Sequence, residues 1–463
     1  MSHTAPHIDP EEVYVLPLAD RWLVFAPGTW SVAVVNHLAL GELAQCCEPG
    51  HVAPSLDALE LWQTLTIPAS DESRHRPPEG GKLVIMPTRA CNISCVHCDF
   101  GCPDAPLTVL DPRLAYPLID RVLARAVRDG EPVMRVHFFG GEPLVARRSV
   151  EAIVAYTRQA CASAHIAPWF ELTTNGVCGP DAVAFLGNEI DSVVVSLDGD
   201  EELHNSLRRH RDGRGTYAEV AETLRQLGRY PCELCVRMCV TDRSVGTLPD
   251  LAEKFCSEFD LSVLAFETLA ETPGSTAAGL HAPSPHEFAL NFMEAETVGA
   301  EHGVRVVHGP SELVGPRSTS CPLGTGSFML WPDGAITGCY LEPERWRARG
   351  LELSFGQVDE AGAVHVDERQ IERIAKILER KPRCERCFCR YTCAGGCRVD
   401  QTPPRCSRFY DDRCHAIRLI TASRLLLSVG ATTEAAALLV NEMAAAGLAS
   451  NADDRLRTWA KVV

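Results

Sequence analysis

Between residues 82 and 308, short and nearly continuous apolar runs alternate with longer stretches in which apolar residues recur every three or four positions. The apolar runs predict six strands, over Leu83–Pro87, Met134–Phe139, Trp169–Thr173, Ser192–Leu197, Leu234–Val240 and Ser262–Phe266. The longer stretches predict helices, over Pro112–Arg128, Arg148–Ala162, Tyr217–Leu227, Leu248–Phe259 and Pro285–Glu301. Apolar strands that alternate with amphipathic helices form a parallel sheet covered by helices. We therefore predict an α/β fold, a partial (β/α)6 TIM-like barrel over residues 81–308.

The chain before the barrel predicts a small α+β domain within residues 1–80. Apolar runs over Tyr14–Leu18 and Trp22–Ala26 predict two strands, while Ser31–Cys46 and Leu56–Leu65 have helical spacing. Pro68–Gly81 is polar and rich in proline and glycine, so we predict a linker between this domain and the barrel.

After His308 the periodicity ends and cysteines become frequent. Phe328–Trp331 and Ile336–Cys339 flank a Pro-Asp-Gly turn and predict a hairpin. Three further segments are predicted: a helix over Glu368–Glu379, a loop-rich cysteine region over Cys384–Cys414, and Ala- and Leu-rich helix over His415–Val463. We expect a cysteine-rich domain over residues 309–420 and a helical segment over residues 421–463.

Charge and composition narrow the possible partners of the chain. A net charge of −17 argues against nucleic acid or an anionic membrane as the main partner, because both are negatively charged. Met1–Glu12 lacks the basic and apolar regions of a signal peptide, and no apolar run is long enough to span a membrane. We expect a cytoplasmic protein whose 21 cysteines stay reduced and are available as metal ligands.

Three of these cysteines, Cys91, Cys95 and Cys98, follow the first predicted strand with the spacing C-x3-C-x2-C. Three thiolates from one loop can hold three irons of a [4Fe–4S] cluster and leave the fourth iron open to another ligand. Two alternatives remain for this spacing alone: coincidence, and a zinc site with Cys102 as the fourth ligand.

The motif resembles the signature of the radical S-adenosylmethionine (SAM) superfamily, C-x3-C-x-aromatic-C, with His97 at the aromatic position. Gly140, Gly141 and Glu142 at the end of the second strand resemble the GGEP motif of that family, which receives the amino group of the cofactor. Glycines let the backbone approach a ligand, and a carboxylate can accept hydrogen bonds from an ammonium group.

The ends of the third and fourth strands also resemble that family. Thr174 and Asn175 end the third strand, and the Ser-Leu-Asp-Gly motif beginning at Ser196 ends the fourth. His204 and Arg208 have the family's H-x3-R spacing, and the resemblance implies that this arginine pairs with the cofactor carboxylate. The cofactor-binding residues implied by the resemblance are Gly140, Gly141, Glu142, Thr174, Asn175, Ser196, Asp198 and Arg208. We expect the neighbouring arginines Arg209, Arg211 and Arg214 to be solvated.

The resemblance implies one-electron chemistry. A reduced cluster, supplied with electrons by a donor such as flavodoxin or ferredoxin, cleaves SAM to methionine and a 5′-deoxyadenosyl radical, which abstracts a hydrogen atom. The protein provides placement of the reactants and a site shielded from water and oxygen.

A second group of cysteines, Cys384, Cys387, Cys393 and Cys397, has the spacing C-x2-C-x5-C-x3-C. Upstream of it, Cys321, Gly334 and Cys339 have the spacing C-x12-G-x4-C. This arrangement resembles the SPASM domain, which carries two auxiliary [4Fe–4S] clusters, for a total of three. The resemblance implies that one auxiliary cluster is bound by Cys384, Cys387, Cys393 and Cys414, and the other by Cys321, Cys339 and Cys397. Either Cys389 or Cys406 supplies the missing ligand of the second cluster, or one iron is open. An open iron that binds a substrate thiolate would favour thioether chemistry.

The remaining cysteines lie in apolar contexts, and we expect them to be small core residues. These are Cys46, Cys47, Cys161, Cys178, Cys232, Cys235, Cys239 and Cys256.

Enzymes with this pair of domains modify peptides or proteins, so the resemblance implies a maturase acting on a ribosomally made peptide or a protein. The modification could be a crosslink, a thioether, an oxidation or an epimerisation. The first alternative is a side-chain oxidase like the anaerobic sulfatase maturases, which carry an aspartate base where this chain has Tyr340. An alternative of another class is a non-catalytic iron–sulfur or zinc scaffold or electron carrier. The weak candidates for the catalytic residue are Asp198, Glu267 and Tyr340.

The N-terminal domain suggests how a peptide could be recruited. In peptide maturases a unit of this size often captures a leader peptide by adding it as a strand to a sheet edge. The alternative is a structural extension of the barrel.

Overall fold

The computed structural model describes residues 13–46, 55–66, 82–98, 100, 107–317, 319–321, 327–379, 384, 387–402 and 408–445. The predicted linker Pro68–Gly81 lies outside the described residues, as do Cys47, Cys102 and Cys406 and the part of the predicted C-terminal helix after residue 445.

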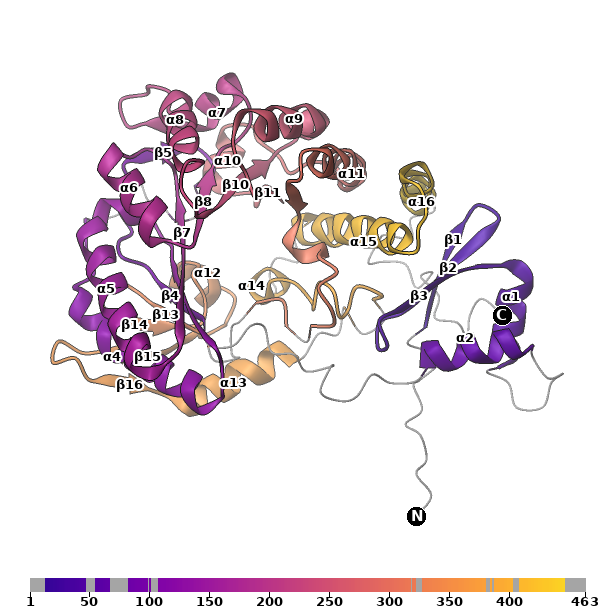
Figure 1. Cartoon of the computed structure of the whole chain (residues 1–463), viewed down its shortest axis with the longest axis horizontal. Coiled ribbons are helices and arrows are strands. Elements are labelled where there is room, and N and C mark those ends of the chain that lie inside the picture. Colours follow the sequence, from indigo (N-terminus) through magenta and orange to yellow (C-terminus); the bar gives the residue numbers. More distant parts are fainter. Residues whose placement is uncertain are drawn as a thin grey trace, which may run out of the picture.

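An antiparallel sheet of three strands followed by two helices forms the N-terminal part of the chain (Figure 1). Its elements are β1 (Tyr14–Leu18), β2 (Arg21–Ala26), β3 (Ser31–Asn36), α1 (His37–Gln45) and α2 (Leu56–Thr66). The strand order is β1-β2-β3, so β3 is an edge strand. The two predicted strands and the helix over Leu56–Leu65 are confirmed.

The helix predicted over Ser31–Cys46 is wrong for its first six residues, which form β3. This stretch contains three valines, whose branched side chains favour the strand conformation, and Val34 pairs with Leu23 across β2 and β3. Helix α1 begins only after Asn36, whose side chain accepts a hydrogen bond from the backbone N–H of Ala39 at 2.9 Å.

A mixed sheet of eleven strands dominates the rest of the molecule, in the order β12-β11-β10-β8-β7-β6-β4-β13-β14-β15-β16. Its parallel strands are β4 (Lys82–Ile85), β6 (Val133–Phe138), β7 (Ala167–Thr174), β8 (Ser192–Ser196), β10 (Glu233–Val240), β11 (Val263–Thr268) and β12 (Arg305–Val307). The first six are the six predicted strands, which confirms the expected α/β fold. The sheet continues from β4 into β13 instead of closing, so the barrel is partial, as predicted.

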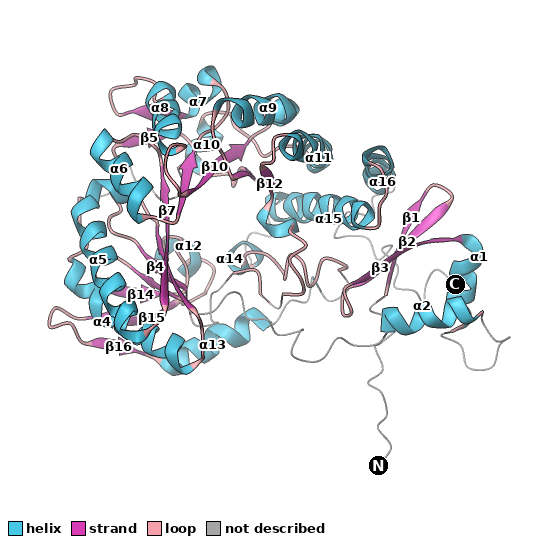
Figure 2. Ribbon diagram, viewed as in Figure 1, coloured by secondary structure: helices cyan, strands magenta, loops and turns pink. Residues whose placement is uncertain are grey.

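Helices cover the outside of this sheet (Figure 2). They are α4 (Pro112–Arg128), α5 (Arg147–Ala164), α6 (Pro180–Glu189), α7 (Glu201–Leu207), α8 (Tyr217–Leu227), α9 (Leu248–Glu258), α10 (Pro273–Ala277) and α11 (Pro285–Glu301). The five predicted helices are confirmed with ends that agree to within two residues. Helices α6, α7 and α10 were not predicted, because they are short and have little helical spacing of apolar residues to indicate them.

The chain after the barrel adds strands and helices to the same fold. The elements are β13 (Phe328–Leu330), β14 (Ala335–Thr337), α12 (Pro343–Arg347), β15 (Ser354–Val358), β16 (Val364–Val366), α13 (Glu368–Glu379), α14 (Arg398–Gln401), α15 (Arg408–Ser428) and α16 (Thr433–Ala445). The hairpin of β13 and β14 and the helix α13 are confirmed. The loop predicted over Cys384–Cys414 is wrong at its end, because Cys414 lies within α15.

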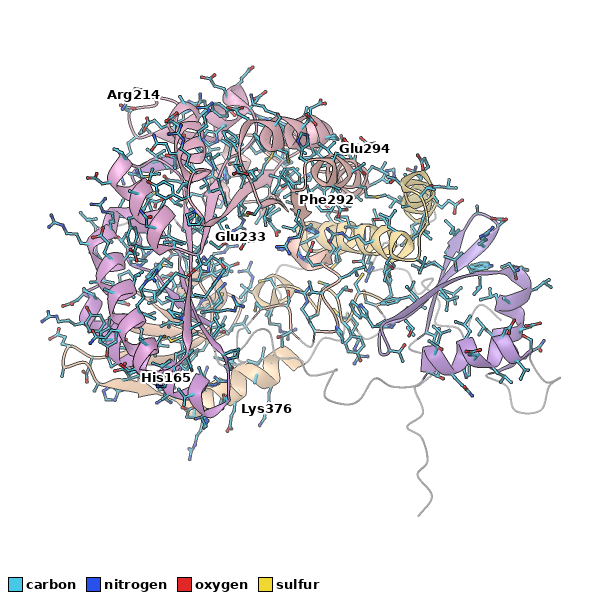
Figure 3. The ribbon with its side chains drawn as sticks, viewed as in Figure 1. His165, Arg214, Glu233, Phe292, Glu294 and Lys376 are labelled. Atoms are coloured by element: carbon cyan, nitrogen blue, oxygen red, sulfur yellow. The ribbon has the colours of Figure 1, made fainter. Side chains whose placement is uncertain are left out.

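Helix α15 packs against α11 of the barrel and against α16, which in turn contacts β1 of the N-terminal sheet. Arg424 on α15 forms ion pairs with Glu296 and Glu312, both at 2.7 Å, and its guanidinium lies over the ring of Phe292 on α11. Phe292 is labelled in Figure 3. The N-terminal sheet packs against α16, and the backbone N–H of Ala19 donates a hydrogen bond to the Glu442 carboxylate on that helix at 3.1 Å. Within the described residues, none of the helices is both long and apolar enough to cross a bilayer.

Candidate functional site

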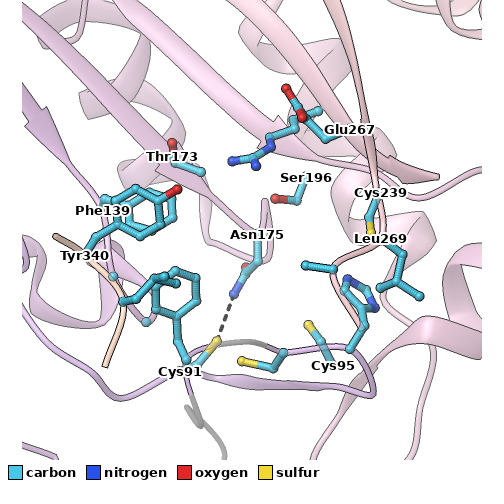
Figure 4. Close-up of a pocket in the computed structure, with 18 of the residues that line it drawn as sticks. Cys91, Cys95, Phe139, Thr173, Asn175, Ser196, Cys239, Glu267, Leu269 and Tyr340 are labelled. Atoms are coloured by element: carbon cyan, nitrogen blue, oxygen red, sulfur yellow. Dashed lines mark hydrogen bonds between the residues drawn. The ribbon is translucent and has the colours of Figure 1, made fainter. Parts of the chain in front are cut away.

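The loop after β4 places the three cysteines of the first motif at one end of a cavity of about 310 Å3 (Figure 4). Two short strands, β5 (Ile93–Cys95) and β9 (Arg208–His210), hold this loop in an antiparallel pair that the sequence did not predict. Their register sets Cys95 opposite Arg208. Residues far apart in the sequence line the cavity: Cys91, Ile93, Cys95, His97, Cys98, Phe100, Phe139, Gly140, Gly141, Thr173, Thr174, Asn175, Ser196, Arg208, Arg237, Cys239, Glu267, Thr268, Leu269, Ala270, Tyr340, Leu341, Arg345, Cys397 and Arg413.

The donor set at the cysteine end fits an iron–sulfur cluster. Asn175 Nδ2 donates to Cys91 Sγ at 3.5 Å, and Arg208 Nη1 approaches Cys95 Sγ at 3.7 Å. N–H donors aimed at sulfur stabilise the thiolate form that binds metal. Within the described residues, no three His, Cys, Asp or Glu side chains lie close enough together to share a single metal ion, and Cys102, the fourth ligand of the zinc alternative, lies outside them.

Gly140 and Gly141 line the cavity, and the structure explains both glycines by close packing against the cysteine loop. A Cβ atom on Gly141 would lie 2.3 Å from the carbonyl oxygen of Ala90. Gly140 has a φ of +137°, and a Cβ atom there would lie 2.4 Å from Met86 Cγ. Only glycine fits at either position.

Glu142 does not line the cavity, unlike the two glycines before it. Its carboxylate accepts hydrogen bonds from Leu144 N at 3.1 Å, from Thr174 Oγ1 at 3.0 Å and from Asn175 N at 2.7 Å. Burial raises the pKa of Glu142 to about 7 despite these donors. In this structure Glu142 therefore joins the ends of β6 and β7 and holds Asn175 in position.

Asp198 is fully buried and lies behind the cavity wall. It accepts a hydrogen bond from Arg208 Nε at 2.6 Å and one from Cys239 N at 2.9 Å. Burial opposes its ionisation, but Arg208 and His97 hold the pKa of Asp198 at about 2. The structure thus places Asp198 as the counterion that orients Arg208, which lines the cavity itself.

His204 also holds Asp198 in place. Its Nδ1 accepts a hydrogen bond from the backbone N–H of Asp198 at 3.1 Å, and its Nε2 lies 3.0 Å from Thr216 Oγ1. The H-x3-R spacing noted in the sequence therefore brings both residues to Asp198 rather than bringing both to the cavity.

Glu267 and Tyr340 lie on the cavity wall, while Asp198 does not. Figure 4 shows Glu267 at the end opposite Cys91 and Cys95. Burial opposes the ionisation of Glu267, but nearby His308, Arg413 and Arg237 keep its pKa below the ordinary value. Tyr340 packs with Phe139 at 5.5 Å and with Phe100 at 6.1 Å between ring centroids, and burial raises the pKa of its hydroxyl.

The distal cysteines form two neighbourhoods. Cys393 is buried, which raises its pKa to about 12, and the nearby thiols of Cys414, Cys387 and Cys384 add to this effect. Arg418 on α15 donates to Cys387 Sγ at 3.3 Å. The other neighbourhood is at the cavity, where Cys397 lies in the wall and both Cys397 and Cys339 influence the pKa of Tyr340.

Arg237, Cys239, Arg345 and Arg413 are among the cavity residues that the sequence analysis missed. Cys239 was expected in the core, but its side chain faces the cavity. Cys235, Arg237 and Cys239 alternate along β10 with buried Val236, Met238 and Val240. A charged residue within an otherwise apolar strand was the signal that could have identified this inward face.

Comparison with known proteins agrees with this site. Residues 85–253, which include Cys91 to Cys98 and every strand-end motif, match the family model described as the Radical SAM superfamily. The chain contains a radical SAM domain. Together with the sulfatase-maturating relatives described below, this match identifies a radical SAM enzyme.

Relatives and solved structures extend the likeness beyond the radical SAM domain. The cysteine-type anaerobic sulfatase-maturating enzyme of Clostridium perfringens (strain 13 / Type A) is 22% identical over 334 residues, covering 68% of this chain and 88% of that protein. A probable GTP 3′,8-cyclase of Methanopyrus kandleri is 29% identical over 279 residues, covering 56% of this chain and 81% of that protein. The solved structure of anSMEcpe with bound AdoMet shares the fold with a TM-score of 0.59 and 19% identity, covering 75% of this chain and 98% of that chain.

Proposed function

We propose that this radical SAM enzyme is a maturase that abstracts a hydrogen atom from a peptide or protein substrate and so installs a modification. The observation that carries the proposal is the composition of the cavity. It joins the cysteine loop and the strand-end motifs of the radical SAM domain to Tyr340, Cys397 and Arg413 of the C-terminal region. When bound, SAM and the reduced cluster would supply the radical. The residues of the chain bind and orient the reactants.

The relatives support a peptide or protein substrate. The Clostridium perfringens relative is named for maturation of sulfatases, and anSMEcpe has also been solved with bound AdoMet and the Cp18Cys peptide. A crosslink, a thioether, an oxidation and an epimerisation all begin with hydrogen abstraction, so each is a possible outcome of the proposed reaction.

Side-chain oxidation of the sulfatase-maturase kind is the second candidate, and the overall likeness to those enzymes favours it. Against it stands Tyr340, at the position where the resemblance expects an aspartate base. Burial raises the pKa of Tyr340, so its hydroxyl is a poor base near neutral pH. Of the other weak catalytic candidates, Glu267 is better placed than Asp198, because only Glu267 lines the cavity.

The proposal is tested with the reduced enzyme, SAM and candidate peptides encoded next to its gene. We expect 5′-deoxyadenosine together with a changed peptide. Loss of two hydrogens indicates a crosslink or an oxidation, and unchanged mass with uptake of solvent deuterium indicates epimerisation. Formation of 5′-deoxyadenosine without any change in these peptides or in a sulfatase-derived peptide would contradict the maturase proposal.

We further propose that the C-terminal region is a SPASM domain with two auxiliary [4Fe–4S] clusters. The neighbourhood of Cys384, Cys387, Cys393 and Cys414 supports one full set of four ligands. Cys321, Cys339 and Cys397 would hold the other, with Cys406 or an open iron completing it. Cys389 is a weaker candidate, because it hydrogen-bonds Cys387 of the first set. Anaerobic reconstitution should give about twelve irons per chain, and about four would leave only the radical SAM cluster.

The N-terminal sheet is proposed to bind a leader peptide along β3, because β3 is an edge strand. Adjacent residues of a strand point their N–H groups to opposite sides, so either Val32 or Ala33 presents its N–H to the open edge. Val32→Pro and Ala33→Pro are made separately, and the variant that removes the outward-facing N–H should lose peptide binding. Equal peptide affinity in both variants and the wild type would contradict this role.

We propose a cytoplasmic location for the enzyme and flavodoxin or ferredoxin as its electron donor. Reduction of the purified enzyme by either donor, followed by 5′-deoxyadenosine analysis, tests the second point.

A further inference from the structure

The cavity wall carries more positive than negative charge. Among the residues that the structure describes, four arginines line it, Arg208, Arg237, Arg345 and Arg413, together with a single carboxylate, that of Glu267. This imbalance stands out in a chain of net charge −17.

Two of these guanidinium groups already have carboxylate partners. Arg208 is paired with Asp198 at 2.6 Å, and Arg413 with Glu267 at 3.6 Å. Both partners are carboxylates of this chain, so the charges of these two arginines are balanced before any substrate binds.

Arg237 differs from both, because its side chain has no hydrogen bond or ion pair with any residue that the structure describes. It lies on the inward face of β10, between Ser196 of β8 and Ala265 of β11 in the register of the sheet. Both neighbours are small and uncharged. Glu267 on β11 lies close enough for Arg237 to lower its pKa, but its carboxylate is already paired with Arg413. The guanidinium of Arg237 is exposed to the cavity rather than to the outer surface.

A guanidinium group inside a cavity loses part of its hydration, and a carboxylate is the partner whose two oxygens match its planar fork. We propose that Arg237 binds a carboxylate of the substrate and so selects a peptide that presents an acidic group to the cavity. This inference rests on the proposed peptide or protein substrate. It deepens that proposal by naming the chemical class that the cavity accepts.

The carboxylate has two sources in a peptide, an acidic side chain and the chain terminus, and blocked pentapeptides distinguish them. The probes are Ac-Gly-Gly-Glu-Gly-Gly-NH2, its glutamine counterpart, and Ac-Gly-Gly-Gly-Gly-Gly with a free or an amidated carboxyl end. Dissociation constants are measured by ligand-observed NMR on the cluster-reconstituted full chain saturated with SAM.

We expect the glutamate peptide, or the peptide with the free terminus, to bind about tenfold or more tightly than its neutral counterpart. The preference should disappear in Arg237→Gln and return in part in Arg237→Lys. Arg229→Gln, which makes the same charge change at an exposed residue outside the cavity, should keep the preference.

Three results would overturn the proposal: equal binding of acidic and neutral peptides, no detectable binding of either acidic peptide, or an acid preference that survives Arg237→Gln. A loss of SAM binding in Arg237→Gln without any acid preference in the wild type would assign Arg237 to the cofactor instead. Because these measurements record binding and not turnover, their failure is distinct from an absence of peptide modification by the wild type.

Discussion

Single residues of this site act mainly through the groups that they hold in place. Gly141 is the clearest case, because a Cβ atom at this position would meet the backbone of both Arg89 and Ala90 in the cysteine loop. Backbone atoms cannot move aside as a flexible side chain can. The substitution should therefore displace Cys91, which directly follows Ala90.

Gly141→Ala is predicted to weaken SAM binding by tenfold or more and to lower the iron content of the radical SAM cluster. Gly179→Ala is the matched control, since a Cβ atom there meets nothing within 4 Å and its φ of −84° suits any residue. Isothermal titration with SAM and an iron assay measure both effects. If both variants bind SAM equally well, the packing argument is wrong.

Buried His308 is predicted to make the free energy of unfolding depend on pH. Burial lowers its pKa to about 4, and its ring packs against Phe288 and Phe292. The unfolded chain takes up a proton near the ordinary histidine value of about 6.5, whereas the folded protein does not until about pH 4. The free energy of unfolding should therefore fall as the pH is lowered through this window.

Between pH 7 and pH 5, His308→Gln should flatten that dependence by about 2 kcal/mol, because pH 5 lies about 1.5 units below the ordinary histidine pKa and each unit corresponds to about 1.4 kcal/mol. Urea unfolding at pH 7 and pH 5 measures the difference between variant and wild type. His281→Gln, a change at an exposed histidine, is the control. A wild type and a His308→Gln variant with the same pH dependence would show that His308 is not buried in its neutral form.

Arg237 and Cys239 show which residues of the site the sequence left unassigned. The cysteine triad and the strand-end motifs could be recognised because the residues of each lie close together in the sequence. Arg237 and Cys239 reach the cavity only through the alternation of β10 and its pairing with β8 and β11. Apart from the charge of Arg237 itself, a near-continuous apolar strand does not indicate which of its faces is inward, so Cys239 could be assigned only once the sheet was known.

At the scale of elements, helix α15 is the part of the fold that sequence reasoning placed least well. The sequence predicts loop at its start, because cysteines and charges interrupt the helical spacing around Cys414. The structure shows that α15 carries Cys414 and Arg418 toward the distal cysteines, while Arg424 fastens it to the barrel. Helices α4, α8 and α11 were predicted with their observed ends, since each has proline or a polar cap at its start and a regular apolar face.

Arg424→Met is predicted to lower the free energy of unfolding by about 3 kcal/mol, because it leaves Glu296 and Glu312 without their partner in a partly buried site. Since α15 carries Cys414, the iron content of the reconstituted protein should fall as well. Arg369→Met on the exposed face of α13 is the matched control and should change neither value. Unchanged stability in Arg424→Met would contradict the role given to α15.

The short pair β5 and β9 illustrates a second limit of sequence reasoning. Three residues on each strand are too few to give a periodic signal, yet this pair sets Arg208 beside Cys95. The partners are more than a hundred residues apart, and only the folding of the barrel brings them together.

At the scale of the whole molecule, the cavity is where the regions meet. The radical SAM domain supplies the cysteine loop and the motifs, and the C-terminal region supplies Tyr340, Cys397 and Arg413. The alternation of strands and helices was enough to predict the partial barrel. It was not enough to predict that β13 to β16 continue the same sheet, because that depends on the pairing of β13 with β4 across more than two hundred residues.

The central claim is that Cys91, Cys95 and Cys98 hold a cluster that cleaves SAM in this cavity. The most direct measurement is anaerobic incubation of the reconstituted, reduced full chain with SAM, followed by quantification of 5′-deoxyadenosine and methionine. We predict that both products form in equal amounts with the wild type and that neither forms when all three cysteines are replaced by alanine. No 5′-deoxyadenosine from the wild type, or equal amounts from the alanine variant, would contradict the claim.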